Sequence, residues 1–451
     1  MNRAAAGRIV WIVLLAWAAG SPPVRPQSEV EMEIRSGEAF RIPILVQPMG
    51  RGATPVAPGV LSSMQGALVQ DLGYTDLFRV FVGTRESSWT EVAGPEDENT
   101  PPPEPQAVVI SILETGGDEV VLKGMMEDYT TGRQFLSEKY RAPADMDVWA
   151  AHAFCDDVTR YLTGEAGIAQ TRIALVGRRG AGETSDVWLI DWDGRRLSRL
   201  TDLGSIVVST TWAPEGRRLA FTSYHTGMAA LAGVDIQDAD LWLISEEAGL
   251  NTAPAWSPRG DRLAFTLSRD GNAEIYTARP DGRDKQRLTF NPTIDTAPAW
   301  SPSGRQIAFT SDRSGRPQVY VMDADGSAVR RLTYWGAWND SPDWSPTGER
   351  IVFAGQLEGG FDLFLIHPDG SGLRRLTQVP GDCENPRWAP DGRHIVYSRR
   401  SGNERRLYVL DAESLRERPL TPATMAAYNP AWSAPLKPSA AGAQWHPAAS
   451  P

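Results

Sequence analysis

The sequence predicts an all-β six-bladed β-propeller that follows a small α/β domain. A Trp-containing motif recurs at intervals of 44 residues through the second part of the chain. Each interval holds four short apolar segments that turn-forming residues separate. A period of about 40–45 residues with four strands is typical of a propeller blade. The part before the repeat instead combines apolar strands with two amphipathic helices, which predicts the α/β domain.

The repeat is anchored by a tryptophan and the turn after it. The motif Trp-Ser-Pro-x-Gly, or a close variant of it, begins at Trp212, Trp256, Trp300, Trp344, Trp388 and Trp432. An aromatic residue follows nine positions after each of the first five, at Phe221, Phe265, Phe309, Phe353 and Tyr397. Proline suits the turn because its ring fixes φ, and glycine suits it because it accepts a positive φ. We expect the recurrent aromatic side chains to form the core between neighbouring blades.

The two ends of the repeat predict how the ring closes. The first unit begins at Arg172 and lacks the Trp strand, whereas the last unit, Asn429 to Ser433, consists of that strand alone. We expect this C-terminal strand to complete the first blade. The count is then six blades of four strands, and closure removes the open ends of the ring.

One unit departs from the pattern. After Trp212, the next aromatic residue that could mark the third strand is Trp242, which comes 30 residues on instead of 20. The Asp-Gly turn and the Leu-Thr pair of the other units are absent there. We therefore expect a long loop from Tyr224 to Asp240. Both a partner contact and a harmless insertion would explain such a loop.

The chain before the propeller has the pattern of a small α/β domain, which we place at residues 28–168. Apolar runs and helical periodicity predict strands at 40–46, 107–113 and 120–126 and helices at 59–72 and 145–163. The Pro- and Glu-rich stretch 84–106 predicts a mobile loop. We place the propeller at 169–435 and a disordered, Ala- and Pro-rich tail at 436–451.

The first 27 residues have the pattern of a secretory signal peptide. Arg3 and Arg8 precede an apolar run of 11 residues from Ile9 to Ala19, which is short for a membrane-spanning helix. A retained N-terminal anchor is the alternative. An exported chain with only two cysteines fits a bacterial periplasm. We expect these two, Cys155 and Cys383, to be unpaired, buried thiols, and a disulfide between them is the alternative.

Composition and motifs argue against nucleic-acid binding and catalysis. The formal net charge of −11 gives no general attraction for nucleic acid. None of the five histidines lies at metal-ligand spacing from another histidine or a cysteine, and the sequence has no Gly-x-Ser-x-Gly motif. The acidic stretch Asp235 to Asp240 could hold a hard cation, but a solvated loop is the favoured interpretation. We predict no catalytic residues, no cofactor and no metal site.

The segments that lead into the Trp strands gather, in a propeller, around one mouth of the central tunnel. Here they are rich in Asn, Asp, Thr and aromatic residues, which suit contacts with a peptide or protein. Turn capping and solvation are the alternative role for each residue. The predicted partner-binding residues at this mouth are Asn251, Thr252, Asp295, Thr296, Trp335, Trp338, Asn339, Asp340, Glu384, Asn385, Tyr428 and Asn429.

The order of the parts resembles the TolB family, the periplasmic propellers of the Tol–Pal envelope system. The resemblance rests on the export signal, the α/β domain, the ring of Trp repeats, Glu29–Gly37 before Ile42–Val46, and Thr171–Ala174 at the junction. It implies a non-enzymatic periplasmic adaptor that supports outer-membrane integrity and invagination during cell division. No direct membrane insertion is implied once the signal is removed.

The resemblance also implies two protein partners. A Pal-like peptidoglycan-associated lipoprotein would bind at the propeller mouth. A TolA-like inner-membrane protein would bind an N-terminal segment, here Glu29, Val30, Glu31, Met32, Glu33 and Ile34.

The chain departs from that family in places, and one rival function stays open. A Pro-rich loop precedes Ala107 where the family has a further helix. Leu250 and Ala297 occupy positions where family members can carry polar or charged contacts, while Asn251 and Thr296 are similar to the family. The rival is a periplasmic propeller that binds an oligosaccharide or peptide in its tunnel, or that gates a separate hydrolase.

Overall fold

The computed structural model describes residues 41–436 except 87–88, 93–102, 117, 147, 180–183 and 358. The predicted signal segment 1–27, the predicted segment Glu29–Ile34 and the predicted tail from residue 437 lie outside the described residues, as does much of the predicted loop 84–106. The described part belongs to one compact unit. Among the described helices, none combines the length and the apolar character that a membrane crossing requires.

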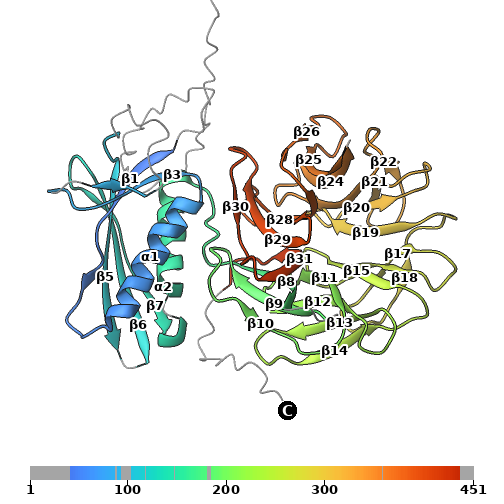
Figure 1. Cartoon of the computed structure of the whole chain (residues 1–451), viewed down its shortest axis with the longest axis horizontal. Coiled ribbons are helices and arrows are strands. Elements are labelled where there is room, and N and C mark those ends of the chain that lie inside the picture. Colours follow the sequence, from blue (N-terminus) through green and yellow to red (C-terminus); the bar gives the residue numbers. More distant parts are fainter. Residues whose placement is uncertain are drawn as a thin grey trace, which may run out of the picture. The chain divides into compact units, whose positions relative to one another are not determined.

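A seven-stranded sheet forms the centre of the α/β domain (Figure 1). Its strands are β1 (Ile42–Val46), β2 (Gly50–Arg51), β3 (Phe78–Val82), β4 (Thr90–Glu91), β5 (Ala107–Gly116), β6 (Glu119–Asp128) and β7 (Gln134–Pro143). The order is β4-β3-β1-β5-β6-β7, and β2 pairs with β5. Strand β1 is parallel to both β3 and β5, whereas β5, β6 and β7 form an antiparallel meander.

Two helices, α1 (Pro58–Tyr74) and α2 (Val148–Thr163), cover one face of this sheet (Figure 1). Proline at the start of α1 suits the first helical position because its φ is already helical. Met64 and Leu68 of α1 and Phe154 and Val158 of α2 are fully buried, so the predicted apolar stripes face the core. Both predicted helices are confirmed, although a 3-10 turn at Ala144–Met146 precedes α2.

The sequence pattern did not predict strands β3 and β7. Strand β7 lies at an edge of the sheet, five of its ten residues are exposed and only one is buried, so its sequence lacks the apolar alternation of a half-buried strand. Strand β3 is a short run of only five residues directly after α1. Its pairing with β1 stabilises it, and the sequence alone does not show that pairing.

Six four-stranded sheets form the propeller, which confirms the predicted fold class. Blade one contains β8 (Arg172–Arg179), β9 (Asp186–Asp191), β10 (Ser198–Arg199) and β31 (Met425–Trp432). Blade two contains β11 (Val207–Trp212), β12 (Arg218–Ser223), β13 (Ala230–Asp235) and β14 (Leu241–Ser245). Blade three contains β15 (Asn251–Trp256), β16 (Leu263–Leu267), β17 (Glu274–Ala278) and β18 (Gln286–Arg287).

The remaining three blades follow the same order. Blade four contains β19 (Asp295–Trp300), β20 (Gln306–Ser311), β21 (Gln318–Asp323) and β22 (Arg330–Arg331). Blade five contains β23 (Asn339–Trp344), β24 (Ile351–Leu357), β25 (Gly360–Ile366) and β26 (Arg374–Arg375). Blade six contains β27 (Asp382–Trp388), β28 (His394–Ser401), β29 (Glu404–Asp411) and β30 (Glu417–Pro419).

The ring closes as predicted. Strand β31 pairs antiparallel with β8, so that Trp432 lies opposite Ile173. Side chains reinforce this join, because the indole of Trp432 donates a hydrogen bond to the hydroxyl of Thr171 at 2.8 Å and the backbone N–H of Arg172 donates to the hydroxyl of Ser433 at 2.9 Å. The first and last repeat units therefore form one blade.

The recurrent residues of the repeat have structural roles. The five aromatic residues that follow the tryptophans by nine positions are fully buried, as predicted for a core between the blades. The threonine of the Leu-Thr pair accepts a hydrogen bond from a third-strand N–H group in five blades, as in Ile275 to Thr289 at 2.9 Å. Cys155 and Cys383 are buried and free, which is also as predicted.

The predicted long loop from Tyr224 to Asp240 is wrong. Blade two has four strands, and its third strand β13 lies within that stretch. Ala232 of β13 pairs with Phe221 just as Tyr276 pairs with Phe265 in blade three. Because Ala232 is not aromatic, the spacing pattern instead placed the third strand at Trp242, which belongs to the fourth strand β14.

Each first strand has a bulge at the same point of the repeat. The pairing register with the second strand shifts there in all six blades. The residue that follows the last regular pair has a positive φ, at Ser209, Ala253, Ala297, Ser341, Asn385 and Asn429. A bulge bends a strand and redirects its side chains, so these six bulges shape one end of the central tunnel.

Glycine in the Asp-Gly turn lets neighbouring blades approach closely. Gly282 of blade three has a φ of +78°, and a Cβ there would lie 2.1 Å from the carbonyl oxygen of Ile244 in blade two. We expect Gly282→Ala to lower the free energy of unfolding by about 2–4 kcal/mol, since the clash adds to the strain of the left-handed conformation.

Gly315→Ala is the matched control for that prediction. Gly315 has a φ of +91° and no neighbouring atom within 4 Å of the added Cβ. Only the strain remains, so we expect a loss of about 1 kcal/mol. Urea unfolding of both variants measures the difference, and equal losses would contradict the contact between the blades.

Candidate functional site

The predicted mouth residues lie together at one face of the ring. In an antiparallel blade, the loop from the fourth strand to the next blade lies at the same face as the loop between the second and third strands. We call this face the mouth face. The first strands contact one another around the ring, and all the predicted mouth residues lie near the start of a first strand or just before it.

Three of the predicted mouth residues, Asn251, Asp295 and Asn339, are fully buried. The amide of Asn251 donates a hydrogen bond to the carbonyl oxygen of Ala229 at 2.9 Å. The carboxylate of Asp295 accepts one from the guanidinium of Arg313 at 2.8 Å, although burial still raises its pKa. These side chains position the loops, and a direct partner contact by them stays a prediction.

The next residue along each of these strands is partly exposed. Thr252, Thr296 and Asp340 each hydrogen bond to a threonine of the preceding blade. The pairs are Thr222 with Thr252 at 3.2 Å, Thr266 with Thr296 at 3.1 Å, and Thr310 with Asp340 at 2.7 Å. These bonds join neighbouring blades and hold the polar groups in fixed places at the mouth.

Blades six and one complete the mouth with a charged and an aromatic residue. The guanidinium of Arg405 lies 3.6 Å from the carboxylate of Glu384 and 5.3 Å from the ring of Tyr428. Burial raises the pKa of Glu384 despite this nearby positive charge. Asn385 donates to the hydroxyl of Ser341 at 3.3 Å. The backbone oxygen of Asn429 accepts from the hydroxyl of Thr210 at 2.8 Å.

The two predicted tryptophans differ in exposure. Trp335 packs in the core of blade five, with its ring centroid 4.4 Å from that of Phe364. Trp338 has 43% of its surface exposed and lies edge-on to Phe361. Trp338 is therefore the one of the pair that a partner can reach directly.

Large apolar side chains outside the predicted set of mouth residues are also exposed at this face. They are Ile206, Met228, Phe290, Ile294 and Tyr334, together with Leu250, which the family comparison had singled out. Phe290 and Tyr334 are each 74% exposed, and both directly follow a Leu-Thr pair. The position directly after the Leu-Thr pair is the sequence signal that could have identified Phe290.

Asp343 and Arg387 place a charged pair on neighbouring first strands. Asp343 belongs to β23 and accepts a hydrogen bond from the backbone N–H of Trp388 on β27 at 2.8 Å. Burial raises the pKa of Asp343 to about 6, against the opposing effect of Arg387. The equivalent residues of blades three and four, Ala255 and Ala299, are small and uncharged.

A buried polar cluster joins the α/β domain to blade one. Asp71 of α1 accepts hydrogen bonds from the indole of Trp192 at 3.0 Å and from the imidazole of His152 on α2 at 2.5 Å. The ligand atoms of Asp71, His152 and Asp193 lie within 4.8 Å of one another, which is a donor set that a metal ion could use.

Positive charge already balances this cluster. Arg195 pairs with Asp193 at 3.2 Å, and Arg172 and Arg196 pair with Asp191. A divalent cation would meet these guanidinium groups, so an ionic contact between the domains is the better interpretation. Burial lowers the pKa of His152, but Asp71 and its acidic neighbours outweigh it and leave the pKa raised.

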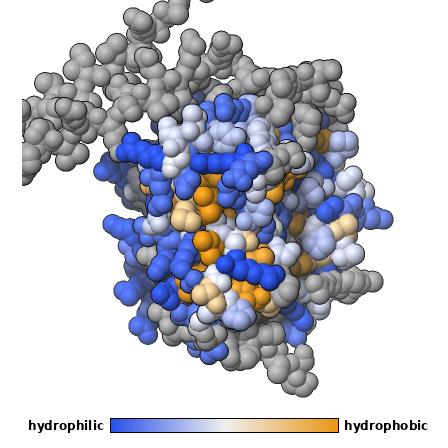
Figure 2. Space-filling view, turned by 90° about the vertical axis from the view of Figure 1, so that its left-hand side faces the viewer, coloured by the Kyte–Doolittle hydropathy of each residue, from blue (hydrophilic) through white to orange (hydrophobic). Residues whose placement is uncertain are grey.

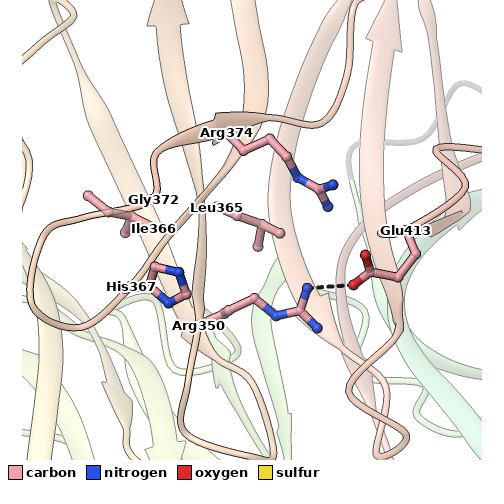
Figure 3. Close-up of a pocket in the computed structure, with 7 residues that line it drawn as sticks. All are labelled: Arg350, Leu365, Ile366, His367, Gly372, Arg374 and Glu413. Carbon is pink, nitrogen blue, oxygen red and sulfur yellow. Dashed lines mark hydrogen bonds and ion pairs between the residues drawn. The ribbon is translucent and has the colours of Figure 1, made fainter. Parts of the chain in front are cut away.

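A pocket of about 250 Å³ lies between blades five and six on the opposite loop face (Figure 3). Its charged groups already have partners. Arg350 pairs with Glu413 at 2.6 Å, Arg374 donates to a backbone oxygen, and His367 hydrogen bonds to the backbone oxygen of Glu349. This pocket connects two blades and offers no group that is arranged for catalysis.

The α/β domain presents an apolar area on the sheet face that the helices leave uncovered. Figure 2 shows apolar side chains in the middle of this face with hydrophilic ones around them. Ile112, Lys123 and Met125 line a shallow hollow of about 350 Å³ there. The sequence analysis assigned no function to this face.

The family follows from the comparison of the chain with family models. The model of the TolB beta propeller domain matches residues 159–436. The chain belongs to this family. The match extends over all six blades and begins within α2.

Curated relatives carry the same name. The Tol-Pal system protein TolB of Cereibacter sphaeroides is 33% identical over 240 residues, which cover 52% of this chain and 54% of that protein. The protein of that name from Roseobacter denitrificans is 31% identical over 240 residues, which cover 51% and 53%. The chain therefore spans about half the length of the curated relatives that it matches.

A solved structure agrees with the fold. TolB from Acinetobacter baumannii superposes with a TM-score of 0.74 at 24% sequence identity, and the match covers 87% of this chain and 96% of that chain. The likeness includes the α/β domain as well as the ring, because the propeller alone makes up a smaller part of the chain.

Asp343 gives a first test of the electrostatics of the ring. Its folded pKa of about 6 lies above the ordinary value of 3.8, so folding favours the protonated form. The contribution of Asp343 to stability is most favourable at low pH and falls as the pH rises from about 4 to 6. We expect Asp343→Asn to gain about 1–3 kcal/mol relative to the wild type at pH 7.5 and much less at pH 4. Urea unfolding at both pH values measures this gain, and a gain equal at both would contradict the assignment.

His152 gives a second test, in which the contribution to stability again falls as the pH rises but the substitution lowers stability instead of raising it. Because its pKa is raised, the protonated imidazole stabilises the folded chain below its unfolded pKa, and this contribution is lost as the pH rises through the folded pKa. We expect His152→Gln to cost about 3 kcal/mol at pH 6, and the cost to shrink toward alkaline pH. His367→Gln, at an exposed turn, is the control and should change stability by under about 0.5 kcal/mol. A cost that stays constant with pH would exclude the protonated pair.

Proposed function

We propose that this protein is a periplasmic, non-catalytic adaptor of the Tol–Pal system that binds a Pal-like lipoprotein at its mouth face. Membership of the TolB propeller family and the names of the curated relatives support this role. The observation that carries it is the surface of the mouth face. Exposed Phe290, Tyr334 and Trp338 stand there beside polar groups that interblade hydrogen bonds hold in place.

The physical chemistry of the mouth face suits a folded protein partner. Exposed aromatic side chains provide most of the affinity at protein interfaces when a partner covers them. Arg287 and Arg331 lie over the rings of Phe290 and Tyr334 at 4.7 and 4.8 Å, so these rings are already oriented before binding. Ordered side chains lose less entropy when a complex forms.

The second partner in this proposal is a TolA-like inner-membrane protein. It would bind the N-terminal segment Glu29–Ile34, which the family resemblance assigns to that role. Two binding regions on one chain would let the adaptor connect an outer-membrane lipoprotein with an inner-membrane protein. Such a connection supports outer-membrane integrity and invagination during division.

The alternative function, binding of a ligand in the tunnel, would use a different part of the propeller. An oligosaccharide or peptide in the tunnel would contact the first strands, on which Asp343 and Arg387 are two of the charged residues. The adaptor instead uses the outer part of the mouth face. Variants at the two places therefore distinguish the two functions.

The test is titration calorimetry of the mature protein with the soluble Pal domain of the same organism. We expect one-to-one binding, and we expect Tyr334→Ala with Trp338→Ala to weaken it by about 10- to 100-fold, since both rings are exposed at the mouth face. The matched control is Leu373→Ala with Leu415→Ala, which removes two exposed apolar side chains from the opposite loop face. Those changes should leave the affinity unchanged.

Two outcomes would contradict the adaptor. An absence of binding at the highest protein concentration would exclude the Pal-like partner. Equal weakening by the mouth-face and control variants would exclude the mouth face as the site. Weakening by Asp343→Asn alone would favour the tunnel as the binding place.

A further inference from the structure

The fourth strand of every blade is an outer edge at which another strand could pair. Such an edge presents N–H and C=O groups that no further strand of its own sheet satisfies. Natural sheets limit unwanted pairing with charged residues, proline and short edge strands. The repeat of 44 residues lets the six edges be compared position by position.

Five of the six blades carry one of these protective features. Three have an ion pair between an arginine of the fourth strand and an acidic residue at the equivalent third-strand position: Arg199–Asp186 at 2.6 Å, Arg287–Glu274 at 3.0 Å and Arg375–Asp362 at 2.5 Å. Blade four keeps the arginine, as Arg331. Blade six has Pro419, which has no N–H group.

Blade two has neither a charged residue nor a proline at these positions of the third and fourth strands. The equivalent residues are Leu243 on β14 and Ala230 on β13. Leu243 is 53% exposed, and Leu241 on the same side of the strand is 51% exposed. Strand β14 is also the longest outer edge, with five residues against two or three in the other blades. Among the described outer strands it is the one whose edge is both long and apolar.

Negative charge flanks this edge at both ends. Asp240 is exposed just before β14, and Glu246 is exposed just after it. Asp238 is exposed as well, but its carboxylate pairs with Arg217 at 2.8 Å. If two copies of the chain paired antiparallel about Leu243, Asp240 of each would lie opposite Glu246 of the other. Like charges opposite each other destabilise a strand pair, so a second copy is disfavoured. Basic residues at both ends of an incoming strand would be favoured instead.

We propose that β14 is a docking edge for an extended segment of a partner protein, which adds a fifth strand to blade two. The segment has apolar side chains in alternation, which cover Leu241 and Leu243, and Lys or Arg residues at both ends. Strand addition of this kind obtains affinity from main-chain hydrogen bonds and specificity from alternate side chains. The site lies on the outer rim of the ring (Figure 1) and is independent of binding at the mouth face.

The probe for this edge is a fluorescein-labelled peptide of sequence KKVTVTVKK, followed by fluorescence anisotropy with the full-length mature protein. We expect saturable binding. The matched peptide EEVTVTVEE should bind at least about tenfold more weakly, because its ends repel the acidic flanks. An absence of saturation up to about 1 mM protein, or equal affinity for both peptides, would overturn the proposal.

The deciding variant is Leu243→Arg with Ala230→Asp, which rebuilds the ion pair that blades one and five possess. We expect peptide affinity to fall at least about tenfold. Leu243→Lys alone, at an exposed position, gives the same readout if the double variant does not fold. The control is Leu373→Arg, which changes the residue equivalent to Leu241 in blade five, 45% exposed and beside Arg375. It should leave the affinity unchanged.

Hydrogen exchange identifies the place of binding. The peptide should slow amide exchange within residues 241–245, and protection confined to another part of the ring would overturn the proposal. Light scattering tests whether a second copy of the chain occupies the β14 edge instead of a partner segment. If the protein forms a dimer that Leu243→Lys converts to a monomer, the edge belongs to a second copy of the chain and the proposed partner segment is wrong.

Discussion

The pairing of β31 with β8 is the contact on which the ring depends. It joins residues that are about 250 positions apart in sequence, and it supplies the first strand of blade one. Without it, blade one would lose its innermost strand and blade six would lose the neighbour that closes the ring, because β31 also contacts β11, β27 and β28. Such a distant contact costs chain entropy before it gives any packing energy. The hydrogen bonds of Trp432 and Ser433 stabilise this join.

Once the ring is closed, the repeat gives each position of the 44-residue unit one physical environment. The first residue of a first strand is buried and holds a loop, as Asn251 does, and the next is partly exposed and bonds to the preceding blade, as Thr252 does. The bulge that follows redirects the strand at the same place in every blade. The proposed functions depend on residues that differ between blades. The exposed rings of the mouth face, the charged pair Asp343 and Arg387, and the apolar edge of β14 are three such differences.

Much of the fold could be predicted from the sequence because it rests on periodic burial. The helices α1 and α2, the six-blade count, the closure and the buried aromatic residues all follow from spacing. Strand β7 could not be predicted because an exposed edge strand has no apolar alternation. Strand β13 was missed because Ala232 stands where other blades have an aromatic residue. The predicted mouth residues lie together at one face of the ring, but sequence does not show which of them are exposed. Asn251, Asp295 and Asn339 are therefore buried where partner contacts were expected.

By itself the sequence determined the propeller, the domain order, the free thiols and the family resemblance, because a repeat of turns and apolar residues leaves few ways to bury its core. Only the tertiary structure decided which residues of each repeat unit reach the solvent. Neighbouring blades and the α/β domain cover some positions and leave others open, and this depends on contacts between segments far apart in the chain. The ionic cluster of Asp71, His152 and Asp193 illustrates this, since three separate segments meet in it. The same reason makes Phe290 and Leu243 surface residues although their sequence neighbours Thr289 and Ile244 are buried.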